Sequence, residues 1–113
     1  MTEIWHNPRC SKSRQTLQLL EDRGIKPAVR LYLQNAPDEI TLRQTAAKLG
    51  VKPAEMMRVK EKLFLELQLT KDDSDQTLFA AMAANPSLIE RPIVLHWERA
   101  AMGRPPEAVL EIL

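Results

Sequence analysis

The sequence of 113 residues is poor in cysteine, glycine and aromatic residues, and it has almost no net charge. Cys10 is the only cysteine, so an internal disulfide is impossible and a reducing compartment is favoured. The formal net charge of +1 gives no electrostatic reason to expect binding to nucleic acid or to an anionic membrane. No apolar run approaches the roughly 20 residues that a membrane-spanning helix needs.

The first residues also lack a basic segment followed by an apolar stretch, the pattern of a secretory signal. We therefore expect a cytoplasmic protein. Hydrophobic residues make up 44% of the chain and charged residues 27%, which is typical of a globular protein. The length suits one hydrophobic core, so we expect a single domain over residues 1–113. The sequence leaves the oligomeric state open, and we expect a monomer.

Hydrophobic spacing predicts a β-α-β unit at the start of the chain. Strands are expected at residues 2–5 and 28–33, where apolar residues alternate or cluster in short runs. A helix is expected between them, from residue 11 to residue 23, because leucines recur there at helical spacing. Gly24 follows this segment as a helix C-cap would.

The middle of the chain is predicted to be helical, and the last part to form a hairpin and a helix. Thr41 and Gln44 form a possible capping box for the first helix of the middle block. Residues 92–97 and 99–103 predict two strands close together in sequence, and residues 105–113 predict a helix that begins with proline.

This order of elements predicts an α/β (α+β) fold. We expect a mixed four-stranded sheet flanked by helices, with a helical insertion after the second strand. That is the layout of the thioredoxin-like fold, although the pattern alone also fits other α+β arrangements.

Cys10 is predicted to lie between the first strand and the first helix, where a thiol ionises readily. Unpaired N–H groups and the helix dipole at a helix start both favour the thiolate. Arg9, Lys12 and Arg14 add positive charge nearby. The same N–H groups can bind an oxyanion. A buried and inert cysteine is the alternative, but the position and the basic neighbours favour a reactive thiol.

The two histidines of the chain, His6 and His96, do not form a credible zinc site with Cys10, and we expect no bound metal. His6 precedes Cys10 by four residues. It can tune the thiol or hold the loop by a hydrogen bond.

Three arginines have suggestive contexts. Arg58 ends a predicted helical turn, Arg91 precedes Pro92 at a strand start, and Arg104 precedes Pro105 after the last predicted strand. A guanidinium group presents a planar fork of donors that suits an oxyanion. A solvated surface position is the ordinary alternative for each of them.

The segment IWHNPRCSKSRQTLQLL, residues 4–20, resembles the N-terminal signature of the glutaredoxin-linked arsenate reductase family. That signature is a strand followed by His-Asn-Pro-x-Cys and then by a Ser-Arg-x-Thr-Leu stretch. The similarity continues in ERPIVL and in GRPPEAVLEIL. The matching residues of the signature are His6, Asn7, Pro8, Cys10, Ser13, Arg14, Thr16 and Leu17.

The resemblance implies a thioredoxin-like fold and the reduction of arsenate to arsenite, which is an oxidoreductase activity. Cys10 corresponds to the nucleophile, and His6 to a histidine that helps to lower the cysteine pKa. Pro92 corresponds to a cis-proline that faces the active site. The implied substrate-binding residues are Arg58, Arg91 and Arg104, and the implied supporting residues are His6, Asn7, Ser13, Arg14 and Pro92.

No second cysteine is present to resolve an intermediate on Cys10, and Ser13 occupies the second position of a Cys-x-x-Cys pair. An external thiol is therefore required. The resemblance implies glutathione as co-substrate and glutaredoxin as partner, without a bound cofactor. Two alternatives remain: a glutathione-dependent thiol-disulfide oxidoreductase of unknown substrate, and a non-enzymatic redox-linked regulator that binds RNA polymerase. Such regulators usually carry a Cys-x-x-Cys pair, so Ser13 argues against the second alternative.

Overall fold

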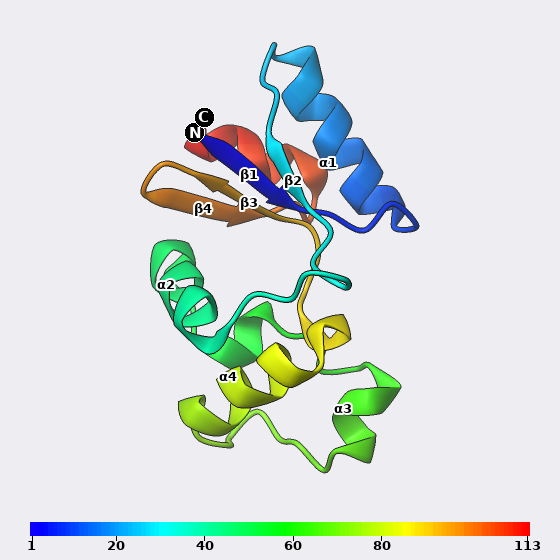
Figure 1. Ribbon diagram of the computed structural model, residues 1–113, viewed down its shortest axis with the longest axis vertical. Coiled ribbons are helices and arrows are strands. Elements are labelled where there is room, and N and C mark those ends of the chain that lie inside the picture. The colour runs from blue at the N-terminus through cyan, green and yellow to red at the C-terminus, as the bar shows by residue number, and fades with distance from the viewer. The chain divides into compact units, whose positions relative to one another are not determined.

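The computed structural model describes every residue from Met1 to Leu113. The chain divides into two compact units, of which the first comprises residues 1–35 and 91–113 and the second residues 36–90. The single domain expected over residues 1–113 stays a prediction. The elements of the first unit (Figure 1) are β1 (Thr2–Trp5), α1 (Ser11–Asp22), β2 (Ala28–Arg30), β3 (Ile93–His96), β4 (Arg99–Met102) and a C-terminal 3₁₀ helix (Pro106–Ile112).

The four strands of the first unit form one sheet with the order β2-β1-β3-β4. β1 runs parallel to β2 and antiparallel to β3, and β4 is antiparallel to β3. A parallel pair needs a crossover connection, which α1 supplies. The predicted mixed four-stranded sheet is therefore confirmed. Its hydrophobic core consists of side chains from the sheet, from α1 and from the 3₁₀ helix, namely Ile4, Leu20, Val94, Val109 and Ile112.

Helix α1 begins directly after Cys10, which is its N-cap residue. Its buried residues are Ser13, Thr16 and Leu20, which recur at the three- and four-residue spacing of a single helix face. Gly24 follows the helix with a φ of +76°, a left-handed conformation that glycine adopts without steric cost. The sequence thus predicted both ends of this helix to within one residue.

The second unit is the predicted helical insertion. Helix α2 packs against α4, and two 3₁₀ helices lie beside α4. Met57, which lies well inside this unit in the sequence, forms an isolated antiparallel bridge with Ile89, near its end. Its elements (Figure 1) are α2 (Glu39–Leu49), a 3₁₀ helix (Pro53–Met56), α3 (Lys62–Glu66), α4 (Asp75–Ala84) and a second 3₁₀ helix (Pro86–Leu88).

The second strand is shorter than predicted. β2 ends at Arg30 because its partner β1 ends at Trp5, with which Arg30 is in register. The N–H of His6 makes the last hydrogen bond to the Arg30 carbonyl, and residues 31–34 then form a turn closed by the Gln34 N–H on the Leu31 carbonyl. The alternation of apolar residues that suggested a longer strand therefore continues into a turn.

Two helix details also differ from the prediction. The N-cap of α2 is Asp38, whose carboxylate accepts a hydrogen bond from the Thr41 N–H at 2.8 Å, so the predicted capping box of Thr41 and Gln44 is wrong. The predicted C-terminal helix is a 3₁₀ helix that begins at Pro106. None of the helices is both long and apolar enough to span a membrane.

Candidate active site

The segment between β1 and α1, residues 6–10, is called the Cys10 loop below. Ser13, which is fully buried, ties this loop to the first turn of α1. Its hydroxyl oxygen accepts the Asn7 N–H at 3.0 Å and lies 2.6 Å from His6 Nδ1. The Cys10 N–H in turn donates to the Asn7 carbonyl at 2.9 Å. These bonds fix the loop and so the direction of the Cys10 side chain.

Two further hydrogen bonds hold the exposed part of the Cys10 loop. Arg14 donates from Nη1 to the Pro8 carbonyl at 2.9 Å. The Asn7 side-chain oxygen accepts the Arg9 N–H at 3.0 Å, which is an Asx turn. Arg14 and Asn7 therefore brace the loop through its backbone.

The pKa of the Cys10 thiol is lowered from its ordinary value. Burial of the thiol is the largest single influence and acts to raise this pKa, because it disfavours the charged form. The Ser13 N–H, the Arg91 guanidinium and the Lys12 N–H together outweigh burial and lower the pKa. The N–H groups of the second and third helical residues of α1 thus act on the sulfur as expected for a helix N-terminus.

Two guanidinium groups lie at the Cys10 sulfur. Arg91 hydrogen-bonds to the sulfur, and Arg104 Nη2 lies 4.0 Å from it. Arg104 also donates from Nε to the Arg91 carbonyl at 2.8 Å. The two residues meet because β3 and β4 are antiparallel, with Ile93 opposite Met102. The residues just before β3 and just after β4 therefore lie at the same end of the hairpin.

Gly103 allows α1 to approach these arginines closely. Its N–H donates to the Pro92 carbonyl at 2.9 Å. A Cβ atom at this position would lie 2.5 Å from Thr16 Oγ1 and 2.7 Å from Pro92 Cγ. Gly103 was not among the predicted site residues. The sequence does offer one signal for it: the chain has only three glycines, and this one directly precedes Arg104.

The Arg91–Pro92 peptide bond is cis, in agreement with the cis-proline that the resemblance implied. The Arg104–Pro105 bond is also cis, which was not anticipated. Each arginine at the sulfur therefore directly precedes a cis-proline.

His6 is buried and contacts Ser13. Burial lowers the pKa of His6, and the positive charge of Arg14 lowers it further. His6 is accordingly a neutral imidazole at pH 7, so it supplies no positive charge to the Cys10 thiolate. Its observed hydrogen bond connects it to the loop through Ser13.

Arg58 is the one predicted site residue that belongs to the second unit. Its Nη1 lies 2.9 Å from a carboxylate oxygen of Glu61, and its N–H donates to the Leu88 carbonyl at 2.7 Å. Its role in binding a substrate stays a prediction. No group of three or more His, Cys, Asp or Glu side chains is arranged as a metal site.

The fold and the site define a thiol protein of thioredoxin-like fold, with one cysteine at a helix N-terminus and two arginines beside its sulfur. The ArsC family model matches residues 5–112, and the chain belongs to the ArsC family.

Several relatives match over nearly their whole length. A protein of Haemophilus influenzae named arsenate reductase is 50% identical over 112 residues, which are 97% of this chain and 97% of that protein. The Escherichia coli K12 protein YfgD, described as uncharacterized, is 51% identical over 98% of this chain and 95% of its own. The structure of an arsenate reductase from Vibrio cholerae has a TM-score of 0.96 at 53% identity, covering 99% of this chain and 97% of that chain.

Proposed function

We propose that this protein is an arsenate reductase that converts arsenate to arsenite through Cys10. The observation that carries the proposal is the pair of guanidinium groups, Arg91 and Arg104, at the sulfur of a cysteine whose pKa is lowered. A thiol that exchanges only with disulfides has no need of two such groups, whereas an oxyanion does. Relatives that are about half identical and carry the name arsenate reductase support the same reaction.

In the first step the Cys10 thiolate attacks the arsenic atom of bound arsenate. An As–S bond forms, and one arsenate oxygen leaves as water after taking up protons. Arg91 and Arg104 hold the remaining oxygens and stabilise the charge that develops on them. Arg58 is the third predicted oxyanion ligand. The Ser13 and Lys12 N–H groups lower the pKa of Cys10 and so favour the thiolate that attacks.

The second step needs an external thiol, and we propose glutathione. Its sulfur forms a disulfide with Cys10, and the two electrons released by the two thiols reduce As(V) to As(III), which leaves as arsenite. A glutaredoxin thiolate then attacks the glutathione sulfur of this mixed disulfide, and Cys10 leaves as the free thiolate. Glutaredoxin takes the glutathione, and no bound cofactor takes part.

The remaining residues position these groups. We propose that His6 acts through Ser13, because its imidazole is neutral and its hydrogen bond is to the Ser13 hydroxyl. Asn7 and Arg14 keep the shape of the Cys10 loop. Pro92 packs close to the Gly103 backbone and so sets the position of Arg91.

A coupled assay tests the reaction. Purified protein is mixed with arsenate, glutathione, glutaredoxin and glutathione reductase, and the oxidation of NADPH is followed. Arsenate-dependent oxidation is expected, and Cys10→Ser should reduce it to the background rate because the nucleophile is lost. A folded wild-type preparation that consumes no NADPH at millimolar arsenate would exclude arsenate as substrate. If the same preparation reduces glutathionylated proteins, a thiol-disulfide oxidoreductase is the better assignment.

A further inference from the structure

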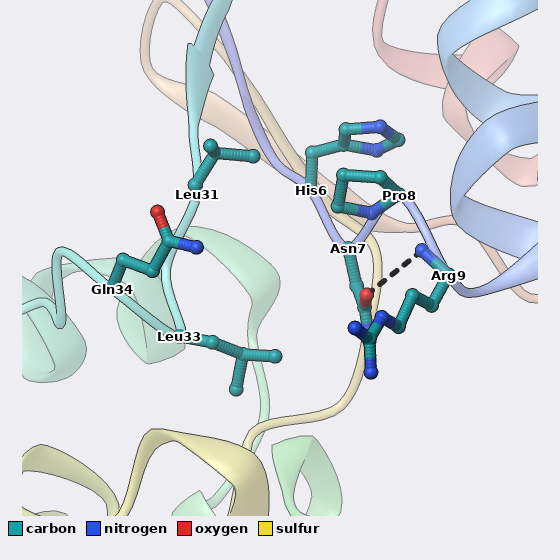
Figure 2. A pocket seen from close by; sticks show the side chains of 7 residues that line it. All are labelled: His6, Asn7, Pro8, Arg9, Leu31, Leu33 and Gln34. Atoms are coloured by element: carbon teal, nitrogen blue, oxygen red, sulfur yellow. Dashed lines mark hydrogen bonds between the residues drawn. The ribbon is translucent and has the colours of Figure 1, made fainter.

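A cavity of about 450 Å³ lies beside the Cys10 loop, on the side away from Arg91 and Arg104 in the order of the strands. One wall is formed by residues 6–9, which follow β1, and the other by Leu31, Leu33 and Gln34, which follow β2 (Figure 2). β1 and β2 are parallel neighbours, so both walls lie at the carboxyl ends of their strands. In open α/β sheets, ligands bind at this end. We call this space the β1–β2 cavity.

The two walls carry apolar surface and unused polar groups. Leu31 and Leu33 are 37% and 45% exposed, and their side chains extend towards the Cys10 loop (Figure 2). The Gln34 carboxamide and the Arg9 guanidinium make no hydrogen bond or ion pair in the structure. The cavity therefore offers the Arg9 positive charge, the unused Gln34 amide and a small apolar surface to a ligand.

We propose that the β1–β2 cavity binds the external thiol, a small anionic peptide thiol of the glutathione type. This inference rests on the proposed function, in which such a thiol must reach Cys10. Cys10 directly follows Arg9, a residue of the wall, so the Cα atoms of these two residues are about 3.8 Å apart. The volume falls within the roughly 300–1,000 Å³ of small-molecule sites. Arg9 would bind a carboxylate of the peptide, Gln34 a peptide group, and Leu33 a methylene segment.

The order of the strands adds a second argument. β1 lies between β2 and β3 in the sheet, so the loop that follows β1 has the cavity on its β2 side. Arg91 and Arg104 belong to the β3–β4 hairpin, on the other side of β1. The oxyanion and the attacking thiol would thus approach Cys10 from different sides. A thiol held in the cavity does not need to displace arsenate from the arginines.

The test uses thiol exchange without arsenate, so that it is independent of the proposed reaction. Cys10, the only cysteine, is first converted to its mixed disulfide with thionitrobenzoate. Glutathione then attacks Cys10 Sγ, a new S–S bond forms, and thionitrobenzoate leaves with the electron pair of the broken S–S bond. Its release is followed by absorbance. 2-Mercaptoethanol, which has neither a carboxylate nor a peptide group, is the reference thiol.

The rate constant for glutathione is divided by that for 2-mercaptoethanol. This ratio measures how much binding of glutathione in the cavity accelerates its attack on Cys10. Arg9→Gln should lower this ratio about tenfold, which corresponds to about 1.4 kcal/mol. Gln34→Ala should lower it less, because a neutral hydrogen bond is weaker than a charge-assisted one. Arg23→Gln is the matched control. Arg23 is an exposed arginine at the other end of α1, and its replacement should leave the ratio as in the wild type.

A second measurement detects binding without thiol exchange. Titration with S-methylglutathione, which cannot exchange, should shift the amide NMR signals of residues 7–9 and 31–34. A ratio unchanged in Arg9→Gln, or shifts confined to other residues, would overturn the inference. Shifts produced at these residues by a glutaredoxin but not by S-methylglutathione would also overturn it, in favour of a protein surface. The predicted ratio and shifts in a protein that does not reduce arsenate would support the cavity and reject the proposed function.

Discussion

The two units of the chain differ in how much of the site chemistry each contains. The groups that lower the pKa of Cys10, namely the Ser13 and Lys12 N–H groups and Arg91, all belong to the first unit. The second unit contributes one candidate, Arg58, which is paired with Glu61. Formation of the thiolate therefore depends on the first unit alone. Arg58 is expected to affect the binding of an oxyanion without affecting the thiol.

Replacement of Arg91 should have the largest effect in this comparison. Arg91→Ala removes both a hydrogen bond to the thiolate and a proposed ligand of the oxyanion. The loss of one such donor typically costs about 100-fold or more in rate. We expect kcat/KM for arsenate to fall by about this factor, and the pKa of Cys10 to rise. An Arg91→Ala protein with unchanged arsenate kinetics would remove this residue from the site.

A methyl group at Gly103 should destabilise the first unit and lower arsenate turnover. Gly103→Ala places Cβ against Thr16 and Pro92, and such overpacking typically destabilises by about 1–3 kcal/mol. The midpoint of urea unfolding measures the loss, and the assay should also show lower arsenate turnover, because α1 and Arg104 are forced apart. Gly50→Ala is the control in the second unit. It meets no atom within 4 Å but has a φ of +70°, so it should cost stability with little change in turnover at saturating arsenate.

Replacement of Arg58 should have the smallest effect. Arg58→Ala should raise KM for arsenate about tenfold, as expected for the loss of one charge-assisted hydrogen bond. The pKa of Cys10 should not change. Glu61→Gln tests the same point through the partner residue, because it removes the negative charge that pairs with Arg58 at 2.9 Å. A change in the Cys10 pKa in either variant would show that the two units do not contribute separately.

Sequence reasoning was most successful where local pattern determines structure. The position of Cys10 between a strand and a helix followed from hydrophobic spacing and from Gly24, and it is confirmed. The mixed sheet followed from the order of the elements. β2 was predicted too long because apolar alternation does not reveal where the partner strand ends. Asp38 was missed as a helix cap because a second plausible cap, Thr41, follows it closely.

The parts of the site that depend on distant contacts were not accessible from local pattern. The meeting of Arg91 and Arg104 depends on the register of β3 and β4. Local context had marked both residues as candidates, but only the family resemblance assigned them to one binding site. The need for glycine at position 103 depends on the approach of α1 to Pro92. The hydrogen bond between Ser13 and His6 requires that both side chains be buried next to each other, which sequence spacing does not specify.

The pKa of Cys10 is the most direct test of a thiolate formed within the first unit. The rate of alkylation of the wild-type protein by iodoacetamide is measured against pH, and Cys10 is the only thiol that can react. Because the pKa is lowered, the thiolate and the rate should persist below pH 8.5, the approximate ordinary pKa of a cysteine, and fall only as pH drops through the lowered value. Arg91→Ala should move the inflection upwards and Arg58→Ala should not. An inflection at or above about 8.5 in the wild type would contradict activation of this thiol.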